Sequence, residues 1–337
     1  MLKYAVSRLI QFPIILAVIY ITTVSLVWIA PGDPFSAASE KNSPERVQQL
    51  KEQYHADTYL NFVTYYGTRA MIGDFGPSLT RRGYEVSEII GNALPVSLAI
   101  GTLAIVFASF GGVFIGTLAA VRQNGVIDYL SLGIALVGVS VPSFVVATTL
   151  LGAFAFSDTF GFLPLGGWPS GENRGYGNLD AYAWGPAWLA ATFDYLKHML
   201  LPAAALSLLP MAYIVRLTRV SMIDVLSSDY VRTARAKGLS KSKVVFKHCL
   251  RNAFLPVLSF LGPATANVLV GSFVVEKIFK LPGLGTFFIE SVQSRDQPMI
   301  LGTVIVFSVL LLFLNLIVDL LYGVIDPRIA VSEGGSK

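Results

Sequence analysis

The chain alternates between long apolar runs and shorter polar segments. Six runs contain no Asp, Glu, Lys or Arg, and they extend over Leu9 to Ala30, Ala93 to Val121, Tyr129 to Ser157, His198 to Val215, Asn252 to Val275 and Met299 to Val318. A helix of about 20 residues crosses a hydrocarbon layer of roughly 30 Å. Backbone in hydrocarbon must satisfy its own hydrogen bonds, and these runs lack the alternation of barrel strands. The pattern predicts an all-α polytopic membrane protein with six transmembrane helices.

Composition agrees with this fold class. Hydrophobic residues make up 54% of the chain and charged residues only 14%, against roughly 25% charged residues in soluble domains. The first run is longer than the apolar core of about 7 to 15 residues in a cleaved signal peptide, so we expect it to remain as a span. The single cysteine, Cys249, excludes an intramolecular disulfide.

The distribution of basic residues predicts the orientation. With a cytoplasmic N-terminus, the inner segments carry the larger share of the Lys and Arg residues, above all segment 216–253. The positive-inside rule therefore places both termini in the cytoplasm. The expected organisation is 1–30 as the N-terminal end and first span, 31–92 outside, 93–328 as a five-helix core with an outer loop at 158–197, and 329–337 as a cytoplasmic tail. In the outer segment, Ser43-Pro44-Glu45 predicts the start of a short helix that reaches Tyr54.

The inner segment 216–253 has the clearest local pattern. Asp229 is positioned to cap a short helix from Tyr230 to Lys237, and Gly238 follows at the position that favours a left-handed residue. Ser240 can cap a second helix that stacks three cations on one face, at Lys243, Lys247 and Arg251. Two readings fit: a projection that docks on a soluble partner, or a basic loop attracted to anionic lipid.

A resemblance distinguishes these readings. The stretch that begins YVRTARAKGLSKSK and ends RNAFLP at Pro256 resembles the EAA-type signature of ABC import permeases, in its oligopeptide/dipeptide version. The resemblance implies a coupling helix that contacts an ATPase, formed by Tyr230, Arg232, Thr233, Ala234, Arg235, Ala236, Lys237, Gly238 and Leu239. The leading glutamate of the signature is missing, with Arg232 six residues before Gly238, so a docking role for that acid does not transfer.

Shorter motifs extend the resemblance over nearly the whole chain. They are Pro31-Gly-Asp-Pro34, Gly73-Asp-Phe-Gly76 with Ser78, Val141-Pro-Ser-Phe144, Val275-Glu276 with Pro282-Gly-Leu-Gly285, Arg295-Asp296 with Pro298, and Asp326-Pro-Arg328. Each is weak alone, but their order and spacing are suitable. The implied fold is the permease architecture of type I ABC importers.

The resemblance implies a permease subunit that forms half of a pathway for di- or oligopeptides in a prokaryotic inner membrane. Its expected partners are a second homologous permease, two ABC ATPase subunits or domains, an extracytoplasmic solute-binding protein and the lipid bilayer, with no nucleic acid. ATP and Mg would be bound by the ATPases, because this chain has no G-x-x-x-x-G-K-[ST] loop and no metal-ligand spacing. We therefore expect neither enzymatic activity nor a cofactor in this chain. Related permeases carry nickel chelates, glutathione, opines or oligosaccharides, which leaves the solute open.

Residues inside the predicted spans give weaker evidence about function than the inner segment does. Pro142, Ser143, Thr265 and Asn267 are candidates for lining the pathway, although interhelical packing and hydrogen bonding explain them equally well. Ala108, Gly112 and Gly116 form a small-residue face that favours helix packing within this chain. Glu276 and Lys277 are expected to anchor a span at the outer interface. Buried ionisable residues are scarce, and this argues against a secondary transporter driven by an ion gradient.

Overall fold

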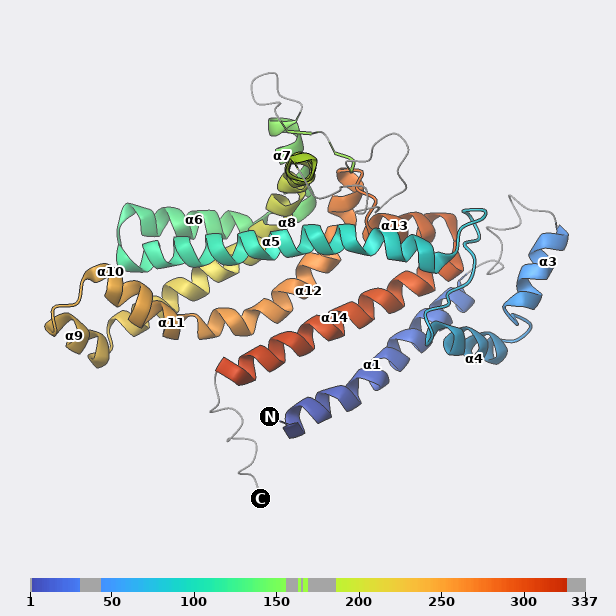
Figure 1. Cartoon of the computed structure of the whole chain (residues 1–337), viewed down its shortest axis with the longest axis horizontal. Helices are drawn as coiled ribbons and strands as arrows, with labels where there is room; N and C mark the ends of the chain where they lie inside the picture. The colour runs from blue at the N-terminus through green and yellow to red at the C-terminus, as the bar shows by residue number, and fades with distance from the viewer. Residues whose placement is uncertain (1, 31–43, 156–162, 165, 169–185, 326–337) are drawn as a thin grey trace.

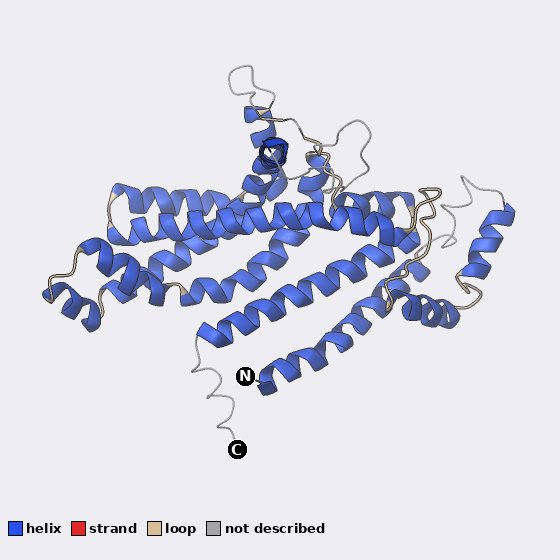
Figure 2. Cartoon of the chain, in the orientation of Figure 1, coloured by secondary structure: helices blue, strands red, loops and turns tan. Residues whose placement is uncertain are grey.

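The structure is a computed structural model that describes residues 2–30, 44–155, 163–164, 166–168 and 186–325. The described part is helical, with one isolated bridge between Pro77 and Glu85 and no strand (Figure 2). The motifs Pro31–Pro34 and Asp326–Arg328 lie outside the described residues. The prediction of an all-α fold is confirmed.

Four helices are long and apolar enough to cross a membrane, and two bent helix pairs raise the number to six. The four are α1 (Leu2–Ile29), α5 (Val86–Val121), α8 (Pro186–Leu226) and α14 (Gln297–Ile325). One bent pair is α6 (Val126–Ser140) with α7 (Ser143–Phe154). The other joins residues 241–253 to α12 (Leu255–Ile278). Each predicted run therefore corresponds to a helix or a bent pair.

Two spans differ from the simple pattern. The third run is broken between Ser140 and Ser143, and its halves meet at 109°. Pro142 lacks an N–H and disfavours a helical residue before it, which explains a break at this point. The fourth run looked shortest in sequence, yet α8 has 41 residues. Lys and Arg end an apolar run without ending a helix, because both are good helix formers.

α5 and α8 pack closely along the small-residue face (Figure 1). Ala108, Gly112 and Gly116 are all buried. A Cβ atom on Gly116 would lie 2.6 Å from the carbonyl oxygen of Val215 and 2.7 Å from Cβ of Thr218 in α8. The predicted packing within this chain is confirmed. The two backbones approach so closely that only hydrogen fits between them.

Substituting Gly116 by alanine should therefore loosen the α5–α8 contact. Overpacking of this kind costs about 1–3 kcal/mol, and thermal unfolding of the detergent-solubilised protein measures it. Gly133→Ala in α6 is the matched control, because a Cβ there meets nothing within 4 Å. Equal melting temperatures for the two variants would contradict the close approach.

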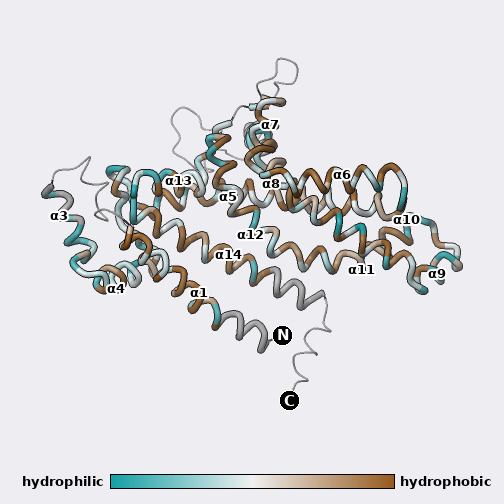
Figure 3. The backbone as a smooth tube through the Cα atoms, turned by 180° about the vertical axis from the view of Figure 1, so that it is seen from behind, coloured by the Kyte–Doolittle hydropathy of each residue, from teal (hydrophilic) through white to brown (hydrophobic). Residues whose placement is uncertain are grey.

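The molecule has two polar ends. At one end lie α9 (Asp229–Ala236), α10 (Lys241–Lys243) and α11 (Leu250–Ala253). At the other lie α3 (Pro44–Gln53), α4 (Tyr59–Ala70) and α13 (Leu284–Ser294) (Figure 1). Figure 3 shows hydrophilic backbone at α3 and around α9 and α10, with apolar helices between them. We call these the α9 end and the α13 end. Helix α3 confirms the short helix predicted after Ser43.

Candidate functional site

Helix α9 begins one residue earlier than the sequence predicted. Ser228, not Asp229, is the N-cap residue, and its hydroxyl donates to the carbonyl of Val225 at 2.6 Å instead of capping the helix. Asp229 lies in the first turn, where its negative charge is favourable next to the free N–H groups. Its ion pair with Arg232, at 3.4 Å, joins two highly exposed side chains and contributes little stability.

One face of α9 is buried and the opposite face is exposed to solvent. Val231 and Ala234 pack in an apolar cluster with Ala120 of α5 and Met222 of α8. Leu239, after the helix, is half-buried in the same cluster. The remaining predicted contact residues are exposed: Tyr230, Arg232, Thr233, Arg235, Ala236, Lys237 and Gly238. The structure thus holds a basic face outward on a helix that is anchored from behind.

Gly238 ends α9 as the sequence predicted. It has φ +76°, its N–H donates to the carbonyl of Arg235 at 2.9 Å, and the N–H of Leu239 donates to Ala234 at 3.3 Å. These bonds satisfy the last carbonyls of the helix and turn the chain sharply. The hydroxyl of Ser240 then accepts from the N–H of Lys243, which confirms the second predicted cap.

The helix after Ser240 is less regular than predicted. A π-helical turn, η2 (Val244–Cys249), interrupts it before α11. In a π-helical turn the hydrogen bonds run from residue i to i+5 instead of i+4. Lys243, Lys247 and Arg251 therefore do not follow the α-helical spacing that was expected to stack them on one face. Lys247 and Arg251 line a common cavity, and Lys243 is not among its lining residues.

This open cavity has a volume of about 1160 Å³ and lies between α5 and the α9 end. The α5 wall carries Ser109, Phe110, Val113, Phe114, Thr117 and Leu118. The facing wall combines apolar residues with Lys247, His248, Arg251 and Asn252. The hydroxyl oxygens of Ser109 and Thr117 are fully buried, and no residue in the described part of the chain forms a hydrogen bond with them. Because these two oxygens are shielded, an occupant of the cavity would find its polar partners on the wall that carries Lys247, Arg251 and Asn252.

The four candidate pathway residues lie apart from this cavity. Pro142 and Ser143 occupy the break between α6 and α7. Thr265 donates to the carbonyl of Leu261 at 2.7 Å, so its hydroxyl is satisfied within its own helix. Asn267 is exposed on α12. An exposed amide on an apolar helix is unfavourable against lipid, which favours a water-filled path or another protein beside it.

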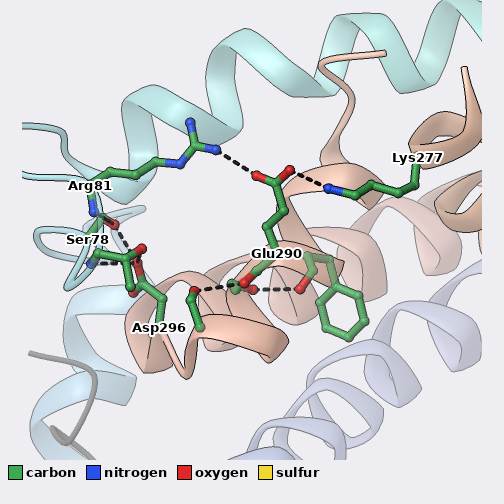
Figure 4. A network of polar contacts seen from close by, with 9 residues as sticks. Ser78, Arg81, Lys277, Glu290 and Asp296 are labelled. Atoms are coloured by element: carbon green, nitrogen blue, oxygen red, sulfur yellow. Dashed lines mark hydrogen bonds and ion pairs between the residues drawn. The ribbon is translucent and has the colours of Figure 1, made fainter. Parts of the chain in front are cut away.

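Several sequence motifs that lie far apart converge at the α13 end (Figure 4). The buried carboxylate of Asp296 accepts from the hydroxyl of Ser78, the N–H of Leu79 at 3.2 Å, and the N–H and hydroxyl of Thr80 at 3.2 and 2.8 Å. Glu290 joins Arg81 at 2.8 Å and Lys277 at 2.6 Å. The loop before α5 is thereby tied to α12, α13 and the start of α14.

Glu276 corrects the expectation of an interface anchor. Its side chain is fully buried, and Oε2 accepts from the N–H groups of Gly285 at 2.8 Å and Thr286 at 3.3 Å. It therefore binds the N-terminus of α13, where an acid is stabilised by the free N–H groups. Its neighbour Lys277 is exposed but paired with Glu290.

A fixed turn precedes this cluster. Asp74 pairs with Arg69, and its other oxygen accepts from the N–H of Gly76 at 3.0 Å. The hydrogen bond to Asp74 is the largest cause that raises the pKa of Arg69. Gly76 has φ +74° and a Cβ there would overlap the hydroxyl of Tyr54. The Gly73–Gly76 motif is thus explained by local geometry.

The sequence did not single out one ion pair near the α9 end. Asp128 of α6 and Arg219 of α8 form an ion pair, although they are 91 residues apart in sequence. The available signal was positional: each residue lies just outside an apolar run, on the side predicted to be cytoplasmic. In the described part of the chain, no three His, Cys, Asp or Glu side chains are grouped to hold a metal.

Comparison of the sequence with known protein families identifies the family of this chain. Residues 112–331 match the family described as the binding-protein-dependent transport system inner membrane component. The chain belongs to this family. The matched residues include α9, η2, α11, α12 and α13.

Relatives of this permease family match almost end to end. The dipeptide transport system permease protein of Bacillus subtilis is 40% identical over 99% of this chain and 100% of its own length. The oligopeptide transport system permease proteins of Salmonella typhimurium and Haemophilus influenzae are 38% and 37% identical, over 98% of this chain and 99% of each relative. This chain is therefore a membrane permease of the binding-protein-dependent type.

Proposed function

We propose that this chain is the permease subunit of an ATP-driven importer and forms half of a pathway for di- or oligopeptides. The relatives named above are dipeptide and oligopeptide permeases over their full lengths. The observation that carries the proposal is α9, an exposed basic helix anchored by Val231 and Ala234 against α5 and α8. A helix held in this way can transmit a push from a partner to the spans.

The proposed energy source is a pair of ABC ATPase subunits or domains that bind ATP and Mg and contact α9. A second homologous permease would complete the pathway, and a solute-binding protein would deliver the peptide at the α13 end. In this arrangement the α9 end and both termini face the cytoplasm. ATP-driven closure of the ATPases would favour one of two openings of the spans, which is alternating access by population shift.

Two features support a pathway beside α5 and α12. One wall of the cavity between α5 and the α9 end carries the polar side chains of Lys247, Arg251 and Asn252. Asn267 is exposed on α12. Pro142 and Ser143 remain candidates through the break that they form, whereas the internal hydrogen bond of Thr265 gives that residue a sufficient structural role.

Co-purification of the tagged chain in mild detergent, followed by mass spectrometry and an ATPase assay, tests the proposal. We expect a P-loop ATPase to copurify with the wild type. It should be lost when Arg235, Lys237 and Gly238 are replaced together, because all three are exposed on the proposed contact face. Replacing the outer cations Arg81 and Lys277 is the matched control and should leave the ATPase bound.

An ATPase-free protein that still transports solute in liposomes under an ion gradient would overturn the proposal in favour of secondary transport. Uptake of labelled dipeptides, set against a nickel chelate, glutathione, an opine and an oligosaccharide, identifies the solute. If one of these other solutes is preferred, the chain is still an importer subunit, but its solute is not a peptide.

A further inference from the structure

The ion pair between Asp128 and Arg219 is the most buried charge pair described in the structure. The Asp128 side chain is 1% exposed and that of Arg219 is 18% exposed. The contact is bidentate, from Nε of Arg219 to Oδ1 and from its terminal nitrogen to Oδ2 at 2.8 Å. A third donor, the N–H of Asn124, reaches Oδ2 at 2.9 Å. A bidentate guanidinium contact fixes orientation as well as distance.

This pair joins α6 to α8 near the α9 end. Farther along the two helices, Gly138 of α6 packs on α8, where a Cβ would lie 3.0 Å from Cβ of Ala212 and 3.1 Å from the carbonyl oxygen of Leu208. Ala135 shares a small apolar cluster with Ala212 and Val215. The small-residue contacts resist compression, and the ion pair adds a directional connection that resists separation and sliding.

Helix α8 leads directly into α9. Only Ser227 and Ser228 separate them, and their N–H groups donate to Ile223 and Val225 of α8 at 3.3 and 3.1 Å. Carbonyl oxygen of Ser228 in turn accepts from Val231 and Arg232 of α9 at 3.1 and 3.2 Å. The link is hydrogen-bonded on both sides, so displacement of α9 is passed first to α8.

Helix α6 follows α5 through the short loop 122–125 and packs on α8 at Gly138. The close approach at Gly116 locks α5 to α8, and the apolar cluster around Met222 joins α5, α8 and α9. α6 is not part of that cluster. Among the described residues, the side-chain ion pair between α6 and α8 is Asp128 with Arg219, and beyond Pro142 the chain continues from α6 into α7.

We propose that Asp128 and Arg219 are positioning residues that make α6 move with α8 and α9 during transport. The pair acts as a clamp that carries the displacement of the coupling helix across to the α6–α7 break. This inference rests on the proposed function. It goes beyond it by assigning a role in energy coupling to two residues outside the coupling helix and outside the pathway.

Asp128→Asn tests the clamp in the complete importer reconstituted in liposomes. The amide keeps the shape of the side chain and removes the charge on which the bidentate contact depends. We expect ATP hydrolysis within about twofold of wild type, with peptide uptake per ATP reduced roughly tenfold, in the range of a coupling energy carried by one contact. Lys277→Gln, which removes an exposed ion pair at the α13 end, is the control and should leave this ratio unchanged.

A second variant guards against a failure to fold. Arg219→Lys retains the positive charge next to Asp128 but cannot form the bidentate contact. Spin labels on exposed Val126 of α6 and Ser242 near α9, with Cys249 replaced by Ala, report the distance between these elements. We expect a narrow distribution that is conserved through the ATP cycle in wild type and a broadened one in Arg219→Lys.

The outcomes separate the two levels of inference. A bound ATPase with an unchanged uptake-to-hydrolysis ratio and an unchanged label distance would overturn the clamp alone. Equal loss of uptake and hydrolysis in correctly assembled complexes would also overturn it, since a merely structural role predicts that result. Failure of wild type to bind any ATPase would instead overturn the proposed function.

Discussion

Replacing Gly238 by proline is expected to abolish solute uptake while the chain still inserts in the membrane. Gly238 has φ +76°, and its N–H donates to Arg235 at 2.9 Å. Proline fixes φ near −65° and has no N–H. The substitution therefore removes the turn and its hydrogen bond, and the contact face of α9 loses its orientation relative to the rest of the chain.

Uptake by cells or proteoliposomes and the amount of chain in the membrane fraction measure this effect. Lys241→Pro is a close control: Lys241 is the first residue of α10, a position that tolerates proline, and Ser240 before it has φ −61° and ψ 147°. We expect near-normal uptake in this control. Gly238→Ala should be intermediate, since a left-handed alanine is strained but keeps the N–H. Normal transport by Gly238→Pro would contradict the coupling role of α9.

Replacing Asp296 by alanine is expected to cause the largest loss of stability. The carboxylate is 1% exposed and accepts hydrogen bonds from Ser78, Leu79 and Thr80. Its removal leaves three backbone N–H groups, those of Leu79, Thr80 and Met299, without this acceptor. At about 1–3 kcal/mol for each unsatisfied buried donor, the loss amounts to roughly 3–5 kcal/mol. Asp296→Asn keeps one oxygen acceptor and should lose about half as much.

Thermal unfolding in detergent measures the loss, and trypsin cleavage after Arg81 or Arg82 reports release of the loop before α5. Asp194→Ala is the control, because the Asp194 side chain is 53% exposed and pairs with His198 one turn away on the same helix. A change within about 0.5 kcal/mol is expected there. If Asp296→Ala melts with the control, the buried carboxylate does not hold the α13 end together.

Local pattern was enough to predict the spans and most of the α9 segment. Each of the six apolar runs became a helix or a bent pair, because a continuous apolar run has no favourable alternative to a helix in hydrocarbon. The turn at Gly238 and the cap at Ser240 also followed from short-range chemistry. The start of α9 differs from the prediction by one residue, with Ser228 as the N-cap, which is the usual uncertainty of a helix end. These features depend on residues within a few positions of one another.

The sequence by itself determined the membrane class, the family resemblance and the exposed basic helix. Tertiary structure alone decided the partners of the charged residues: Asp128 with Arg219, Glu276 with the start of α13, and Asp296 with the loop at Ser78. It also decided the size of the bend between α6 and α7, 109°, whereas the position of the break follows from the chemistry of Pro142. The physical reason is that a charge next to an apolar run can end at a lipid interface or in a buried contact. Only the packing of helices distant in sequence determines which of these it finds.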